Sequence, residues 1–109
     1  MIYNLNVPVK SPTGENYKNG DKEDTLWNIA KVVISQPMQD DPANLEFQKK
    51  VRGIYGKLDD SENGEVDFKV SSMEFILERM FKAKVPYTVS LAFGKLFQEP
   101  LTQAQLDDV

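Results

Sequence analysis

The residues best suited to hold a metal ion lie in one acidic segment of the chain. Side-chain oxygens stand at the first, third, fifth and ninth places of an EF-hand-type calcium loop, on Asp59, Ser61, Asn63 and Asp67, and a glycine stands at the sixth. Ca²⁺ prefers oxygen ligands, and the glycine permits the sharp turn of such a loop. The twelfth place carries Val70 instead of a bidentate Glu. We therefore favour an ordinary solvated turn, in which any bound cation is held weakly.

The same segment allows a second interpretation based on a metal ion. Asp67-Phe68-Lys69 is similar to the acidic-x-Lys end of metal-dependent nucleases, with Asp59 as a second carboxylate. In such sites a carboxylate holds Mg²⁺ and a lysine stabilises developing charge. The pattern is only two residues long, and the charged face of a strand explains it better. A divalent-metal-binding protein or metal-dependent nuclease using residues 59–69 is thus the alternative function.

The composition excludes most other catalytic sites. The chain has no histidine and no cysteine, so it cannot build a Ser-His-Asp triad, a Cys-His pair or an ordinary zinc centre. It also has neither of the glycine patterns that cradle phosphate in Walker and Rossmann sites. We therefore predict a protein that is not an enzyme and that needs no cofactor.

The charge of the chain argues against nucleic acid as a partner. Of its 109 residues, 17 are acidic and 13 basic, which gives a formal net charge of −4 that repels a phosphate backbone. No stretch approaches the roughly 20 apolar residues that span a bilayer. The first residues show no basic and apolar pattern of a secretion signal. The expected location is the cytoplasm.

Two short strands are expected to form a small sheet. Tyr3, Leu5, Val7 and Val9 alternate with polar residues and Pro8, a period of two that places one face of a strand on a core. Residues 66–70 alternate in the same way. We expect the N-terminal strand to pair with this second strand near residues 65–70.

The first two helices are expected between residues 25 and 58. Asp24 or Thr25 can cap the first, which should stop before Pro37. Asp41 is expected to cap the second, with Pro42 as its first helical residue. Its apolar stripe consists of Phe47, Val51, Ile54, Tyr55 and Leu58. Gly53 within this helix indicates close packing against a neighbour.

Two further helices and an acidic tail are expected after the second strand. Ser71 and Glu74 form a capping box for the third helix. Its expected buried stripe consists of Met73, Ile76, Leu77, Met80 and Phe81. The fourth runs from Tyr87 to Gln98, is apolar around much of its circumference and ends at Pro100. Residues 102–109 form one turn, with Thr102 and Gln105 as a weak capping pair, or stay disordered.

These elements define an α+β fold that is mostly helical, with about four helices. We expect one domain over residues 1–109, which is an ordinary size for a single domain. Residues 1–24 form a strand and a polar loop, residues 25–98 the helical body, and residues 99–109 the acidic tail.

Several short motifs together resemble a group of small, mostly uncharacterised proteins of tailed bacteriophages and prophages. They are the segment 5–9 with its Asn-x-Pro motif, Gly14-Glu15, Thr25-Leu26 at a helix start, and the segment 85–89 before the last helix. These motifs mark turns and helix starts, so the resemblance implies a phage origin and transfers no functional residue. The expected location then becomes the host cytoplasm.

The leading functional prediction is a non-enzymatic, phage-type accessory protein that binds another protein. Its partner is a second copy of itself, a host protein or a virion component. The reason is a surplus of large apolar side chains that a domain of this size does not wholly cover. The candidate contact residues are Trp27, Tyr87, Phe93 and Phe97. For Trp27 taken alone, a buried anchor is favoured over stacking on a ligand.

Overall fold

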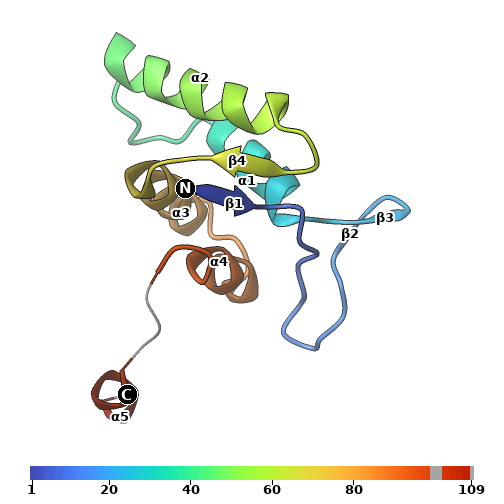
Figure 1. Ribbon diagram of the computed structural model, residues 1–109. Helices are drawn as coiled ribbons and strands as arrows, with labels where there is room; N and C mark the ends of the chain where they lie inside the picture. Colours follow the sequence, from blue (N-terminus) through green and yellow to red (C-terminus); the bar gives the residue numbers. More distant parts are fainter. Residues whose placement is uncertain (99–101, 109) are drawn as a thin grey trace.

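The computed structural model describes residues 1–98 and 102–108, and it has the predicted α+β, mostly helical fold (Figure 1). The elements in chain order are β1 (Ile2–Asn4), β2 (Lys18–Asn19), β3 (Lys22–Glu23), α1 (Leu26–Ser35), α2 (Leu45–Asp60), β4 (Glu65–Asp67), α3 (Val70–Lys82), α4 (Tyr87–Gly94) and α5 (Gln103–Asp107). No helix in the described ranges is long and apolar enough to cross a membrane.

The predicted pairing of the N-terminal strand is confirmed. β1 and β4 pair antiparallel, with Tyr3 opposite Val66, and both of these side chains are buried in the core. β1 is shorter than expected because the chain changes partners after Asn4. The Leu5 N–H donates to the Gly64 carbonyl at 2.8 Å, and the Leu5 carbonyl accepts from the Trp27 N–H at 2.8 Å. The chain beyond β1 is thus tied to the start of α1.

The limits of α1 agree with the sequence, whereas the start of α2 does not. Thr25 caps α1 by accepting the Asn28 N–H at 3.2 Å, and the helix ends before Pro37. The predicted cap of the second helix was wrong. α2 begins three residues after Pro42, and its N-cap is Asn44, which accepts the Phe47 N–H. Asp41 is not free to cap a helix because it is bound by a distant arginine.

The predicted capping box of α3 is also wrong. α3 begins at Val70 with Lys69 as its N-cap, and no side chain caps it. Because the Lys69 carbonyl accepts the N–H groups of Ser72 and Met73, Ser71 lies inside the first turn. The expected buried stripe of this helix holds except at Phe81, which is 60% exposed.

The last two helices are shorter than the sequence indicated. α4 ends at Gly94 instead of Gln98, and its last carbonyls are satisfied in a turn where the Gln98 N–H donates to the Gly94 carbonyl. Pro100, the expected stop, lies outside the described residues. In the tail, the predicted capping pair is confirmed, because Thr102 and Gln105 form a capping box at the start of α5.

The buried side chains form one cluster to which α1, α2, α3 and α4 all contribute. α1 contacts both α2 and α3, and α4 packs on α3. Ala30 of α1, Leu58 of α2, Met73 of α3 and Phe93 of α4 are all fully buried. Gly53 does not lie at a close contact, since a Cβ built there meets no atom within 4 Å, so that expectation was wrong.

Candidate binding groove

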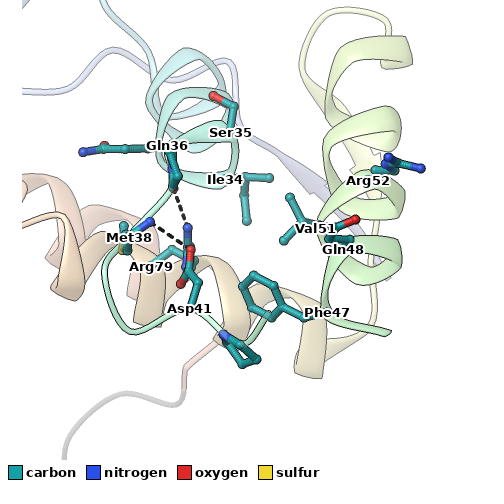
Figure 2. A pocket seen from close by; sticks show the side chains of 12 residues that line it. Ile34, Ser35, Gln36, Met38, Asp41, Phe47, Gln48, Val51, Arg52 and Arg79 are labelled. Carbon is teal, nitrogen blue, oxygen red and sulfur yellow. Dashed lines mark hydrogen bonds and ion pairs between the residues drawn. The ribbon is translucent and has the colours of Figure 1, made fainter. Parts of the chain in front are cut away.

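A groove of about 450 Å³ opens between the end of α1, the loop that follows it and the first turns of α2 (Figure 2). Its apolar lining consists of Ile34, Pro37, Met38, Pro42, Phe47 and Val51. Its polar lining consists of Ser35, Gln36, Asp41, Gln48, Arg52 and Arg79. The groove therefore combines an apolar surface with a few fixed polar groups, the mixture typical of binding sites.

Local sequence explains how the two helices form the walls of the groove. α1 must stop before Pro37, and the capping side chain of Asn44 restarts the helix on the other side of the loop. Phe47 and Val51 are four residues apart on α2 and so share one face. In Figure 2, Val51 points across the groove toward Ile34, and Phe47 lies beside the loop.

The loop is fixed from behind by Arg79 of α3. The guanidinium of Arg79 forms an ion pair with Asp41 and donates a second hydrogen bond to the Gln36 carbonyl. Asp41 also accepts the Met38 N–H at 2.9 Å. The Arg79 side chain is 3% exposed and that of Asp41 16%, so the pair is largely removed from water. One arginine thereby joins α3, the end of α1 and the loop.

The ion pair sets the protonation of Asp41. The hydrogen bond from Arg79 lowers the pKa of Asp41, partial burial opposes this, and the Met38 N–H and the charge of Lys82 lower it further. Asp41 is therefore a carboxylate at neutral pH, held by its neighbours. Both charged groups at the back of the groove are already engaged, which makes them poor candidates for acid–base chemistry.

Charged side chains of both signs lie near the groove. Arg52 lines it, and its side chain points outward in Figure 2. The Lys50 ammonium lies 4.5 Å from the centre of the Phe75 ring, and that ring meets Phe47 edge-on at 5.9 Å. The acids Asp40 and Glu46 lie close by in sequence and are exposed. The rim thus carries charges of both signs, and Asp41, the acid that lines the groove, is neutralised by Arg79.

No protein-family model matches the chain, and neither do curated proteins or solved structures. The geometry of the chain itself is therefore the basis for a functional assignment.

The sequence did not identify the Arg79–Asp41 pair. Asp41 was interpreted as a helix cap, and Arg79 was assigned no role. A weak signal was present, since Arg79 lies three residues after Ile76 and beside Met80, both fully buried. Arg79 and Phe81 flank the apolar stripe of α3 on opposite sides. The sequence alone does not say which flank faces the loop.

The four predicted contact residues do not form one surface. Phe93 is a correction: it is fully buried in the core and is not available to a partner. Phe97 is half-buried, and its ring packs edge-on against Phe93 at 5.9 Å. Tyr87 is 73% exposed, with Leu91 one turn further along the same face of α4. Only Tyr87 is thus strongly exposed.

Trp27 has a structural role in the described fold. It is half-buried, and its Nε1–H donates to the Leu58 carbonyl at 2.7 Å, which links α1 to α2. The Lys31 ammonium lies over its ring, 4.6 Å from the centroid. These contacts agree with the interpretation of Trp27 as an anchor.

The residues proposed as metal ligands are dispersed. Asp59 lies in the last turn of α2, where a calcium loop would need extended chain, and Ser61 donates back to the Leu58 carbonyl. A cavity of about 300 Å³ contains Ser61 and Asp67, and Lys57, Asp60, Glu65 and Val66 complete its lining. Asp59 and Asn63 do not line it. Within residues 1–98 and 102–108, no three His, Cys, Asp or Glu side chains gather as a metal site requires.

Two cationic groups bind oxygens of Asp67, one in its side chain and one in its backbone. The N-terminal ammonium donates to its Oδ1 at 3.0 Å, and this hydrogen bond lowers the pKa of Asp67. The Lys57 ammonium donates to its backbone carbonyl at 3.2 Å. Lys69, the third residue of the proposed nuclease motif, is the N-cap of α3. These cations would repel a metal ion that approached Asp67, and the ion could bind only by displacing them.

Proposed function

We propose that this chain is a non-enzymatic accessory protein that acts by binding another protein, and that it binds through the groove between α1 and α2. The observation that carries the proposal is the composition of the groove. Apolar side chains from two helices face an open volume of about 450 Å³, and the two charged groups behind them already pair with each other. Such a site offers contact area and orientation without a reactive group.

The form of the groove favours a helical or extended segment of a protein as its occupant. Phe47 and Val51 lie one turn apart and face Ile34, so they can receive apolar side chains with helical spacing. Gln48 and Arg52 also line the groove and can bind polar groups of the same segment. A partner with apolar anchors and an acidic flank meets both requirements.

The wider biological role rests on the sequence motifs alone. Their resemblance to small phage proteins supports a phage-type accessory role in the host cytoplasm, with a host or virion protein or a second copy as partner. The groove supplies a place on the chain where such a partner would bind.

A photo-crosslinking experiment tests the proposal. The photoreactive residue p-benzoylphenylalanine replaces Gln48, which lines the groove, or Lys49, which is exposed on the same helix and does not line it. We expect covalent adducts with protein from position 48 in a bacterial lysate, and markedly fewer from position 49. Adding Val51→Glu should abolish them by placing a charge on the apolar floor. Equal adducts from both positions, or adducts that survive Val51→Glu, would contradict the proposal.

A further inference from the structure

The tail helix α5 has no packing partner in the described structure. It buries none of its residues, and Leu106 is 51% exposed although the helix begins with a complete capping box. In Figure 1, α5 lies apart from the four larger helices. A helix of five residues is unstable in water by itself, because nucleation costs more than so few hydrogen bonds return. A surface to pack against would therefore stabilise α5.

The groove between α1 and α2 has the chemistry that α5 requires. Leu106 matches the apolar floor formed by Phe47 and Val51. Asp107 and Asp108 follow it directly and are exposed, while Arg52 lies at the rim. Opposite charges at the edge of an apolar contact guide association and fix its orientation.

We infer that α5 of one copy of this chain docks in the groove of a second copy, with Leu106 on the apolar floor and the carboxylates of Asp107 and Asp108 toward Arg52. The inference rests on the proposed function, since it names the partner of the same groove. Reciprocal exchange places one tail in each groove and closes a symmetric dimer. Because a helix this short covers far less than about 1,000 Å², the dimer should be weak and concentration-dependent.

Charge reversal of the full chain tests the pairing. Sedimentation velocity from micromolar to millimolar protein should show the wild type shifting from monomer to dimer, less so at high salt. Arg52→Glu alone, or Asp107→Lys with Asp108→Lys, should remain monomeric over this range. An equimolar mixture of the two variants should again form dimers, since each tail then meets a groove of opposite charge. The matched control is Lys22→Glu in the β2–β3 hairpin, which should dimerise like the wild type.

Several outcomes would overturn the inference. A wild type that stays monomeric at millimolar concentration would do so, as would variants that dimerise separately as well as they do when mixed. NMR spectra of the backbone amides show whether the tail instead docks in the groove of its own chain. The Gln48 and Val51 signals would then respond to the tail substitutions without changing on dilution, and this result also overturns the second copy as occupant.

The proposed function and the inference fail in different ways. A monomeric chain that still gives adducts from position 48 with other proteins, abolished by Val51→Glu, keeps the groove as a binding site and removes only α5 as its occupant. A dimer that forms normally despite Val51→Glu would remove the groove from the association altogether.

Discussion

Asp41 and Arg79 are 38 residues apart in the sequence and form an ion pair that fixes the loop between α1 and α2 onto α3. Through the same guanidinium, the Gln36 carbonyl at the end of α1 is held in place. The wall of the groove formed by this loop is thus positioned by one side chain from another helix. The shape of the groove depends on the pair even if no ligand touches it.

Removing the carboxylate should destabilise the fold. Asp41→Ala leaves the buried guanidinium of Arg79 without its counter-charge, and we expect a loss of about 3 kcal/mol in the free energy of unfolding. Urea denaturation followed by circular dichroism measures this. Asp40→Ala is the matched control, and as a change of an exposed neighbour it should stay within about 0.5 kcal/mol of the wild type.

A double variant measures the interaction energy between Asp41 and Arg79 separately from the effect of losing each side chain. Replacing both partners, with Asp41→Ala and Arg79→Met, removes the unpaired charge as well as the bond, so it should cost clearly less than the sum of the two single changes. Strict additivity would show that the two side chains do not interact in solution.

The ion pair should also make stability depend on pH in the acidic range. The pKa of Asp41 in the folded protein lies below its usual value of 3.8, so the unfolded chain takes up a proton first as the pH falls. The contribution of the pair is complete above the unfolded pKa and is lost as the pH falls through the folded pKa. Urea midpoints of the wild type should therefore decline from about pH 5 downward. The gap to Asp41→Ala should narrow as the pH falls below the usual value of 3.8 and through the lower pKa of the folded protein, and a constant gap would contradict this origin.

Gly64 should be among the least replaceable residues of the fold. Its φ is +77°, and a Cβ built there lies 2.7 Å from the backbone nitrogen of Asn6. Gly64→Ala should therefore cost roughly 3 kcal/mol, from backbone strain together with a clash that no side-chain rotation relieves. Gly20 separates the two causes, since its φ is +70° and its surroundings are open. Gly20→Ala should cost only about 1 kcal/mol, and equal losses at both sites in thermal unfolding would count against the contact with Asn6.

Gly53 should show the opposite effect. It lies in the middle of α2, is exposed, and has no atom within 4 Å of a Cβ built on it. Gly53→Ala should raise the free energy of unfolding by about 0.5 to 1 kcal/mol, because alanine loses less backbone entropy in a helix. Gly56→Ala meets the same open space and serves as an independent repeat. A loss of stability at Gly53 would indicate that α2 packs against something at this position in solution.

Gly53 also illustrates how far the sequence predicts this fold. Features set by a few neighbouring residues were predicted correctly, such as the cap at Thr25 and the stop before Pro37. The pairing of β1 with β4 was predicted because alternation marks both strands. The predictions that were wrong concerned features that depend on how distant elements pack together. Spacing does not say that Gly53 faces open space, or that Phe93 is fully buried.

The candidate site was missed for a related reason. Asp41-Pro42 is a favourable sequence for a helix start, and nothing near it in the sequence signals that an arginine three elements later, in α3, binds the carboxylate. Because Asp41 is paired with Arg79, α2 starts at the next suitable cap, Asn44. The residues between α1 and Asn44 stay outside a helix and form a wall of the groove. Tertiary contact outweighs local preference here, because burying Arg79 without a partner would cost more than the loss of one cap.

Trp27 offers a test of whether a conspicuous aromatic residue serves the fold or a partner. Trp27→Phe removes the Nε1–H that donates to the Leu58 carbonyl at 2.7 Å, while that carbonyl keeps its bond from Ser61. We expect a loss of about 1 to 2 kcal/mol in urea denaturation followed by circular dichroism, with binding at the groove unchanged once the protein is folded. Tyr87→Phe, a comparable change at a 73% exposed ring, should leave stability within about 0.5 kcal/mol. If Trp27→Phe kept full stability but lost the adducts at position 48, Trp27 would belong to the binding surface and its contact with α2 would be incidental.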